Sequence, residues 1–356
     1  MKVLTAFPVK KTLRSRLDQI DFKKLEFGKY VSDHMFMCDY VDGEWTSPQI
    51  LPYANLSLSP ATLALHYGQT VFEGMKAFKM QDGRINIFRL SKHYDRLVKS
   101  LERMCMAVIP KHIFEEALMQ LVSLDRSWVP GEPGTALYIR PFMFASEARF
   151  GVKISDEYRF IVFTGPTPSL FNSPISVKIE SYFSRAGKGG TGFAKCGGNY
   201  GSAFLPTREA RMEGYDQVLW TDATEHLFIE ESGMMNVMFV LDDKLVTPSL
   251  SDSILDGVTR DSLLTLANDL GFGIEERPVS ILELKQAFKD KTLSAAFGAG
   301  TAAVVSPISI IGIDGVDYEL PPCDDDHIMY QLKAKLENIR FGAEADIHGW
   351  NTILVD

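Results

Sequence analysis

A proline-rich break divides the sequence into two unlike halves. Residues 165–174 read GPTPSLFNSP, and their three prolines and one glycine interrupt every periodic hydrophobic pattern. Such a composition is typical of an exposed connector between domains. The 356 residues also exceed what one small core usually holds. The sequence therefore predicts a small N-terminal domain at 1–168, a linker at 169–177 and a larger domain at 178–356.

Both halves mix helical and strand-like patterns. In the first half, 91–106 and 112–128 have the apolar spacing of helices, with Ser91 as a candidate N-cap, and 135–144 and 157–165 are rich in aromatic and β-branched residues. The second half adds predicted strands at 216–222, 226–232 and 236–248, the last of which turns at Asp242-Asp243. It also adds predicted helices near 259–270 and 281–288. The second of these helices begins with a capping box formed by Ser280 and Glu283. The expected class is α+β.

Composition and charge exclude several partners. A net charge of −9 argues against a nucleic-acid-binding surface, which needs clustered Lys and Arg. The most apolar late stretch, 302–313, contains Pro307 and is shorter than the ~20 residues of a membrane span. Four cysteines without a CxxC pair indicate no metal site and a reducing cytoplasm. The basic segment 1–17 weakly resembles a transit peptide, and we interpret it as an N-terminal arm.

A lysine lies inside an unusually dense group of glycines. Residues 185–200 read RAGKGGTGFAKCGGNY and place Lys195 among six glycines. Glycine permits backbone angles and close approaches that other residues forbid, so the density indicates a built site and makes the lysine a candidate covalent catalyst. A surface lysine in a flexible loop is the alternative, and for an isolated pattern of this kind it is the more frequent one.

Three later features fit one cofactor if this lysine holds an aldehyde. Gly257-Val258-Thr259 leads into an amphipathic stretch, and amides at a helix N-terminus bind phosphate. FGAGTAAVV at 297–305 offers a second loop of amides and a hydroxyl. Glu230 or Glu231 ends an apolar strand, where a buried carboxylate can keep a pyridinium nitrogen protonated. Each feature alone has an ordinary reading as a helix cap or a solvated charge; together they are the groups that pyridoxal phosphate requires.

Seven segments carry a resemblance to a known family. The chain resembles the branched-chain amino acid aminotransferases, which are pyridoxal-phosphate enzymes of fold type IV. The matching segments occur in the family's order over most of the chain: HYGQTVFEGMKAF (66–78), INIFRLSKHYDRL (85–97), ALYIRPF (136–142), GGTGFAKCGGNYGS (189–202), FIEESGMMN (228–236), LDGVTRDSLL (255–264) and FGAGTAAVVSP (297–307). The resemblance implies a small α/β domain and a larger domain with a pseudo-barrel β core.

The resemblance also assigns residues to the cofactor, pyridoxal 5′-phosphate. It implies that Lys195 forms the Schiff base and shuttles the proton, and that Glu231 holds the pyridine nitrogen. The other implied cofactor contacts are Tyr200 near the phenolic oxygen and Arg96, Val258, Thr259 and Thr301 on the phosphate. The glycines then bring backbone close to a flat cofactor and leave the lysine room to swing.

Substrate residues follow from the same resemblance. Arg140 is implied to pair with the γ-carboxylate of glutamate. The amides of Thr301, Ala302 and Ala303 are implied to hold the α-carboxylate. The implied apolar walls are Phe27, Tyr67, Phe72 and Tyr138, with Phe150 and Val152 supplied by the partner subunit of a homodimer. Without this match, core packing is the ordinary role of such aromatic residues.

The implied reaction moves the amino group of L-leucine, L-isoleucine or L-valine to 2-oxoglutarate in two half-reactions. A D-amino acid aminotransferase, an aminodeoxychorismate lyase and a non-catalytic pyridoxal-phosphate-binding protein are the alternatives. Three positions depart from relatives: residues 303–306 lack a CxxC switch, and Leu170 and Met234 replace a tyrosine and a threonine. These changes put linker closure and one hydrogen bond in doubt and leave the core chemistry intact.

Overall fold

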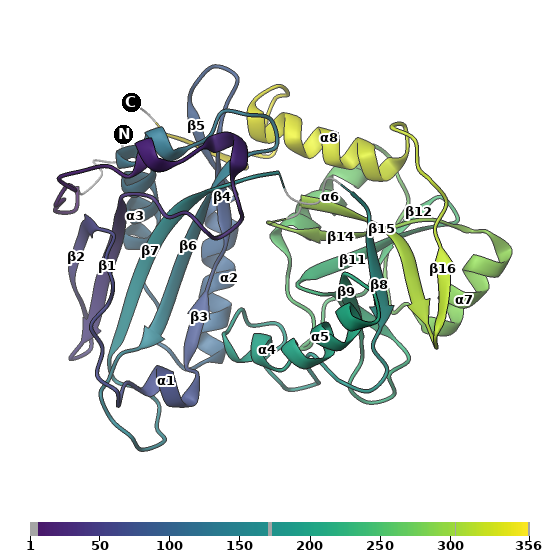
Figure 1. The fold of residues 1–356 in the computed structure, drawn as a ribbon, viewed down its shortest axis with the longest axis horizontal. Coiled ribbons are helices and arrows are strands. Elements are labelled where there is room, and N and C mark those ends of the chain that lie inside the picture. Colours follow the sequence, from purple (N-terminus) through teal and green to yellow (C-terminus); the bar gives the residue numbers. More distant parts are fainter. Residues whose placement is uncertain (1–5, 170–172, 303, 355–356) are drawn as a thin grey trace. The chain divides into compact units, whose positions relative to one another are not determined.

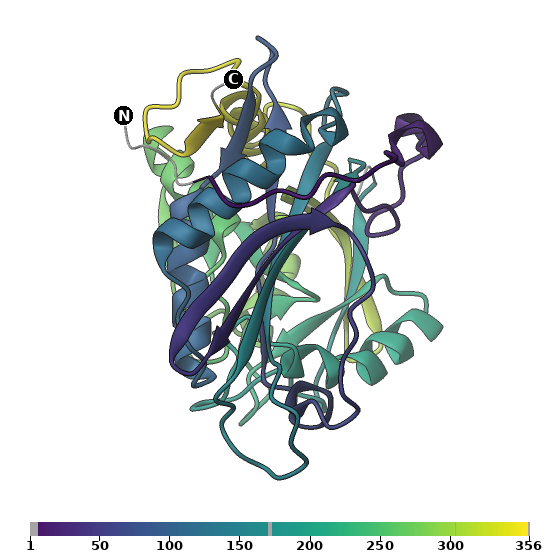
Figure 2. The same ribbon diagram turned by 90° about the vertical axis from the view of Figure 1, so that its left-hand side faces the viewer.

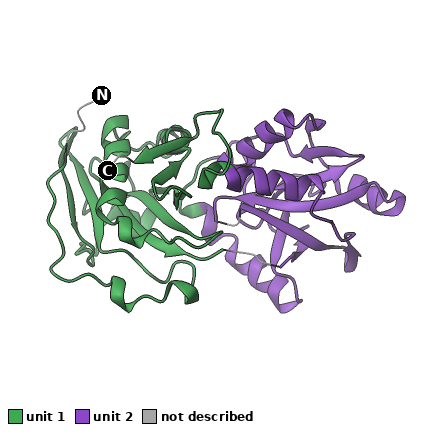
Figure 3. Cartoon of the chain, turned by 90° about the horizontal axis from the view of Figure 1, so that it is seen from above, with its two compact units in different colours: residues 1–170, 194–198, 339–356 green, residues 171–193, 199–338 purple. Residues whose placement is uncertain are grey.

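The chain forms two compact units that do not follow the sequence continuously. The computed structural model describes residues 6–169, 173–302 and 304–354. Unit 1 comprises Met1–Leu170, Ala194–Gly198 and Ile339–Asp356, and unit 2 comprises Phe171–Phe193 and Asn199–Asn338 (Figure 3). The predicted domains, 1–168 and 178–356, are continuous, whereas two later segments belong to unit 1. They do so because their backbones pair with strands of its sheet.

Unit 1 is built on an antiparallel sheet. Its strand order is β17-β5-β4-β6-β7-β1-β2, with β3 also paired to β6. The strands are β1 His34–Val41, β2 Glu44–Pro52, β3 Thr70–Phe72, β4 Met75–Lys79, β5 Ile85–Phe88, β6 Ala136–Ala145, β7 Tyr158–Thr167 and β17 Asn351–Leu354. The last of these joins the sheet edge by pairing with β5.

Two helices cover one face of this sheet (Figures 1 and 2). They are α2 Leu90–Arg103 and α3 Lys111–Leu124, and a short helix, α1 Leu63–Tyr67, precedes β3. Three short 3-10 helices are η1 Leu17–Gln19, η2 Phe22–Lys24 and η3 Arg126–Trp128. The apolar stripe of α2 includes Leu97 and Leu101, both fully buried in the core beneath the sheet. The opposite face of β6 is thereby left to the cavity described below.

Unit 2 contains a closed ring of strands. The path β10-β9-β8-β15-β14-β11 is closed by the pairing of β10 with β11, and β12, β13 and β16 extend the sheet beyond the ring. The strands are β8 Ile175–Ile179, β9 Gln217–Thr221, β10 Ile229–Ser232, β11 Met235–Leu241, β12 Lys244–Thr247, β13 Ile274–Glu276, β14 Leu293–Gly300, β15 Val304–Ile313 and β16 Val316–Glu319. The residues of β11 are buried throughout, so both faces of this strand are covered.

The remaining helices lie wholly or mostly in unit 2. They are α4 Gly198–Gly201, α5 Phe204–Met212, α6 Val258–Asp269, α7 Ile281–Asp290 and α8 Ile328–Phe341. Ser280 is confirmed as the N-cap of α7, because its hydroxyl accepts a hydrogen bond from the Glu283 N–H at 3.0 Å, while the Glu283 carboxylate of the predicted capping box pairs with Arg277. Among the described residues, no helix combines the length and the apolar character needed to cross a bilayer.

The predicted α+β class and the barrel-like core are confirmed, and one local prediction is wrong. Helix α2 begins at Leu90 rather than at Ser91, because Arg89 precedes it in the left-handed conformation with φ of 55°. The Ser91 hydroxyl donates instead to the Glu115 carboxylate on α3, at 2.9 Å. The hairpin at Asp242-Asp243 is confirmed, and both residues have positive φ values, as a two-residue turn between β11 and β12 requires.

Candidate active site

Lys195 is fixed to unit 1 through both of its main-chain polar groups. Its carbonyl accepts a hydrogen bond from the Phe72 N–H of β3 at 3.0 Å, and its N–H donates to the Ser100 hydroxyl of α2 at 2.9 Å. The Gly197 N–H continues the pairing by donating to the Thr70 carbonyl at 3.2 Å. A Cβ at position 197 would lie 2.4 Å from the Thr70 hydroxyl, so this approach requires glycine.

The Lys195 amine lies above an aromatic ring that it shares with an arginine. Its Nζ is 4.9 Å from the centre of the Phe72 ring, and the guanidinium carbon of Arg140 is 4.8 Å from the same centre. Cations at such distances are attracted to the ring face. The structure thus brings three of the predicted site residues together within one unit.

Arg96 is buried in an ion-pair cluster with two other side chains. Its Nε and Nη2 donate to the two carboxylate oxygens of Glu73 at 2.7 and 2.8 Å, and His93 Nδ1 lies 2.9 Å from Oε2 of the same carboxylate. Burial raises the pKa of Glu73, but Arg96 and His93 outweigh it and hold that pKa well below its usual range. Burial lowers the pKa of His93, which favours the neutral imidazole. The Arg96 guanidinium therefore has a fixed orientation.

Glu231 in unit 2 receives backbone and side-chain donors. Its Oε1 accepts hydrogen bonds from the Leu255 N–H at 2.7 Å and from Asn236 Nδ2 at 3.3 Å, and Arg185 Nε lies 3.2 Å from its Oε2. The two donors to Oε1 and the nearby guanidinium, whose Nε forms an ion pair but no hydrogen bond, favour the ionised carboxylate, although the residue is only 3% exposed. Glu230, its neighbour on β10, differs, because burial raises its pKa. The environments of the two carboxylates support Glu231 rather than Glu230 as the partner of a protonated ring nitrogen.

The glycine-rich segment packs closely against the loop 251–255. The Gly189 N–H donates to the Asp252 carboxylate at 3.1 Å, and the Phe193 N–H donates to the Asp252 carbonyl at 3.0 Å. A Cβ on Gly192 would lie 2.6 Å from the Ser253 Cα. At this position glycine therefore serves a backbone contact between two loops of unit 2, a role that the sequence did not indicate.

The start of α6 has the features of an anion site. Its N-cap, Gly257, provides no side-chain hydrogen bond to the first turn, and a Cβ there would lie 1.8 Å from Asn236 Oδ1. Val258 and Thr259 are buried at the first two helical positions. Amides at such a terminus carry a partial positive charge that attracts phosphate.

The remaining predicted cofactor and carboxylate contacts lie in turns of unit 2 or outside the described residues. Tyr200 is half-buried in α4. Thr301 and Ala302 are half-buried in the turn between β14 and β15. Ala303, at the end of the predicted carboxylate-binding turn, lies outside the described residues, as does Leu170. Met234 is 72% exposed at the turn between β10 and β11.

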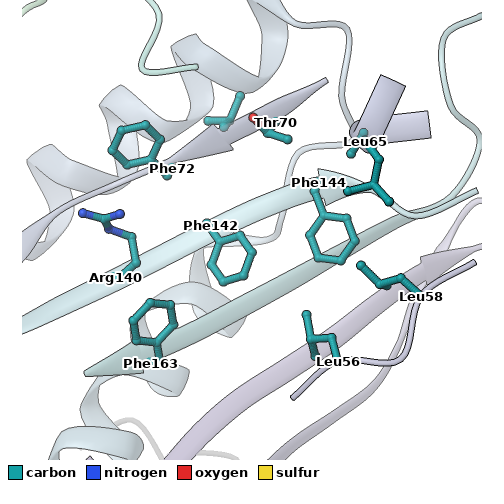
Figure 4. Close-up of a pocket in the computed structure, with 11 residues that line it drawn as sticks. Leu56, Leu58, Leu65, Thr70, Phe72, Arg140, Phe142, Phe144 and Phe163 are labelled. Atoms are coloured by element: carbon teal, nitrogen blue, oxygen red, sulfur yellow. The ribbon is translucent and has the colours of Figure 1, made fainter. Parts of the chain in front are cut away.

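An apolar cavity of about 440 Å³ extends from Phe72 and Arg140 over the face of β6 (Figure 4). The rest of its lining, which the sequence did not indicate, consists mainly of leucines and phenylalanines: Phe163 beside Arg140, and Phe142, Phe144, Leu56, Leu58 and Leu65 farther along. Alternation along β6 places Arg140, Phe142 and Phe144 on one face, and this period-2 pattern is the signal that could have found them.

A smaller cavity of about 160 Å³ contains other predicted substrate residues. Phe27 and Tyr138 meet edge to face with ring centres 5.3 Å apart, and Arg140 Nη2 donates to the Tyr138 hydroxyl at 3.0 Å. Arg140 therefore borders both cavities. Its Nε is buried and has no hydrogen-bond partner among the described residues.

The other predicted walls lie on the surface of unit 1. Phe150 and Val152 are 85% and 82% exposed in the loop between β6 and β7, and the Tyr67 hydroxyl donates to the Phe150 carbonyl at 3.3 Å. Sequence reasoning missed Glu73, His93, Ser100 and Arg185. Glu73 had the clearest signal, an acid between apolar residues in VFEGM, but the pattern alone did not reveal its partners.

Comparison with known proteins identifies the family to which this fold and these residues belong. The family model for amino-transferase class IV matches residues 70–311. The chain therefore belongs to the class IV aminotransferase family.

Relatives and solved structures agree with this assignment. Branched-chain-amino-acid aminotransferase 2 of Bacillus subtilis is 41% identical over 336 residues, which cover 93% of each chain. The branched-chain-amino-acid aminotransferase of Mycobacterium tuberculosis is 41% identical and covers 91% of this chain and 90% of the relative. The branched-chain amino acid aminotransferase of Escherichia coli superposes with a TM-score of 0.71 and 25% identity over 89% of this chain and 98% of its own.

A further solved structure shows the same fold. It is the branched-chain amino acid aminotransferase of Thermobaculum terrenum in its PLP-form, which has a TM-score of 0.73 and 23% identity and covers 90% of this chain and 98% of its own. The predicted fold type is confirmed by these structures.

Proposed function

We propose that this chain transfers the amino group of L-leucine, L-isoleucine or L-valine to 2-oxoglutarate, with pyridoxal phosphate as its cofactor. The observation that carries the proposal is the arrangement in unit 1. A lysine with a fixed main chain holds its amine over Phe72, and an arginine borders an apolar cavity on the same ring. Relatives that are 41% identical over more than nine tenths of the chain support the substrate class.

The residues present fit pyridoxal phosphate. The N-terminus of α6 has no side-chain cap and can receive a phosphate through its amides, while Glu231 has donors on one oxygen and a cation near the other. We propose that Val258, Thr259, Thr301 and Arg96 hold the phosphate, that Tyr200 approaches the phenolic oxygen, and that Glu231 keeps the ring nitrogen protonated. Bound there, the cofactor supplies an aldehyde that condenses with amines and a ring that accepts electrons.

The roles of the chain's own residues are to hold the cofactor, to move a proton and to orient the substrate. Lys195 would hold the cofactor covalently through its amine, and the amine, once released, would carry a proton to and from the substrate Cα. The hydrogen bonds from Phe72 and to Ser100 fix the Cα of the lysine, so the side chain swings about a constant point. Proximity of this kind lowers the entropy cost of the proton transfer.

Arg140 suits a pocket that must accept two kinds of side chain. Stacking on Phe72 and Tyr138 covers its faces with aromatic surface, and we propose that its guanidinium pairs with the γ-carboxylate of glutamate. The apolar cavity walls suit leucine, isoleucine and valine, because burying such a side chain is worth roughly 1.5–3 kcal/mol. We propose that Thr301, Ala302 and Ala303 hold the α-carboxylate that both substrates share.

We further propose that the protein is a homodimer that acts in the cytoplasm. The exposed Phe150 and Val152, on one loop of unit 1, support a partner subunit that covers them. The described cysteines are all free, in accord with a reducing compartment.

The test is a direct comparison of substrates. The protein is incubated with pyridoxal phosphate, 2-oxoglutarate and either L-leucine or D-alanine, and the 2-oxo acid products are quantified. We expect 4-methyl-2-oxopentanoate from L-leucine and little pyruvate from D-alanine. Turnover of D-alanine alone would reject the branched-chain assignment, and turnover of neither would leave a binding protein.

A further inference from the structure

Arg185 occupies the centre of a buried polar cluster in unit 2. Its side chain is 10% exposed, and its Nε lies 3.2 Å from Oε2 of Glu231. Its Nη2 donates to the Ser253 carbonyl and, at 3.3 Å, to the Gly192 carbonyl. One guanidinium thus joins the glycine-rich segment, the loop 251–255 and the carboxylate of β10.

Two consecutive carboxylates lie near this arginine, and their surroundings differ. Glu231 faces the guanidinium and accepts the Leu255 N–H. Glu230 accepts a hydrogen bond from the Ser253 hydroxyl through Oε1, and its Oε2 is buried without a hydrogen-bond partner among the described residues. Burial raises the pKa of Glu230, and Arg185 only partly offsets that rise. The two carboxylates therefore have different hydrogen-bond and charge environments in the protein alone.

We propose that Arg185 is a positioning residue that makes Glu231, rather than Glu230, the ionised carboxylate and holds it in place. The inference rests on the proposed function, in which Glu231 keeps the cofactor ring nitrogen protonated. Two adjacent carboxylates in a buried site cannot both stay charged without a compensating cation. A protonated Glu231 would lose the negative charge that stabilises a ring N–H.

The carbonyl contacts give the arginine a second effect. Because Nη2 is held by Ser253 and Gly192, the guanidinium cannot rotate away from Glu231. The same contacts fix the loop 251–255, from which the Leu255 N–H donates to Glu231. A lysine could supply the charge, but its single nitrogen could not lie both beside Glu231, as Nε does, and between the two carbonyls, as Nη2 does.

The test compares holoenzyme variants by steady-state kinetics and infrared spectroscopy at neutral pH. Arg185→Met should lower kcat about 100-fold, the scale of losing one preorganised electrostatic contact, with KM changed less than about threefold. Its spectrum should gain a protonated-carboxyl band that disappears in Arg185→Met combined with Glu231→Gln. Arg185→Lys should keep Glu231 ionised and recover at least about tenfold in kcat relative to the methionine variant.

Arg277 offers a matched control in the same unit. It also lies between two glutamates, Glu275 and Glu283, and it contacts the Pro278 carbonyl. Arg277→Met should leave kcat within about twofold and add no carboxyl band that depends on Glu231.

Two results would overturn the proposal. One is an Arg185→Met enzyme with wild-type kcat or without the new band. The other, which applies even if that variant does not fold, is an Arg185→Lys enzyme that shows Glu231 protonated. Failure of the wild-type enzyme to transaminate would reject the proposed function instead, while the infrared comparison would still report on Arg185.

Discussion

The two units stabilise their buried charges in different ways. In unit 1, the lysine cluster, which we define as Glu73, His93, Arg96, Ser100 and Lys195, is held mainly by side chains of α2 and by Glu73, which lies between β3 and β4. In unit 2, the glutamate cluster, which comprises Arg185, Glu230, Glu231, Asn236 and residues 251–255, depends on main-chain groups of loops. Side-chain ion pairs fix orientation, whereas loop amides and carbonyls also depend on the path of the backbone.

The two clusters should therefore be disrupted by different kinds of substitution. The lysine cluster should fail when a single charged partner is removed, because a buried charge is then left unpaired. The glutamate cluster should fail when loop geometry changes, as would follow a side chain at Gly192 or Gly257.

Lys195→Ala should abolish the activity. Removal of the amine takes away both the covalent link and the proton carrier, so turnover of L-leucine should fall by more than about 10³-fold. Because the main-chain bonds at residue 195 remain, thermal unfolding should stay close to that of the wild type. Substantial residual turnover would place the catalytic amine elsewhere.

Glu73→Gln should destabilise unit 1. The neutral amide leaves Arg96 without its counter-ion, at a cost of about 3 kcal/mol or more in the free energy of unfolding at pH 7. The folded-state pKa of Glu73 is below its ordinary value of 4.5, so its contribution is present above pH 4.5 and is lost as the pH falls below it. Between pH 7 and pH 3, the free energy of unfolding measured with urea should fall less steeply with decreasing pH in the variant than in the wild type. Equal slopes would mean that the ion pair contributes little.

Arg140→Met should separate the two half-reactions. Loss of the guanidinium removes the partner of the γ-carboxylate, so kcat/KM for glutamate should fall about 10- to 100-fold, the scale of one charge-assisted hydrogen bond. The value for leucine should change by less than about threefold, since the apolar cavity walls remain. Single-turnover kinetics with each amino acid measures this, and equal losses would contradict the dual role.

Ser100→Ala should have the smallest effect. It removes the acceptor of the Lys195 N–H and the bond to the Arg96 carbonyl, which should cost about 1–2 kcal/mol of stability and raise hydrogen exchange at Lys195. Thr265 makes the same kind of hydroxyl bond to the carbonyl four residues earlier in α6 and serves as the control. Thr265→Ala should leave exchange at Lys195 unchanged.

Local signals in the sequence predicted much of the fold. Turn residues such as Asp242-Asp243 and the N-cap at Ser280 act over a few neighbours, so their outcome is visible without tertiary structure. The N-cap at Ser91 was wrong because α2 packs beside α3, where Glu115 offers the hydroxyl a tertiary partner. The return of 194–198 and 351–354 to the first unit is a long-range pairing that no local pattern specifies.

The residues of the candidate site show the same difference between local and long-range signals. Lys195 and the start of α6 were indicated by glycine and helix-start chemistry that follows from local sequence. Arg96 is polar on an amphipathic helix and looks solvated until the fold supplies Glu73. Arg185 gave no signal, because its role depends on carbonyls that loop folding brings to it.

Chemical identification of the reactive lysine tests whether Lys195 binds the cofactor covalently. The wild-type protein is incubated with pyridoxal phosphate, reduced with borohydride, digested and analysed by peptide mass spectrometry, with Lys195→Ala treated in parallel. We predict one quantitatively modified residue, Lys195, and no stoichiometric label in the variant. Modification of another lysine in both proteins, with Lys195 unmodified, would contradict the account.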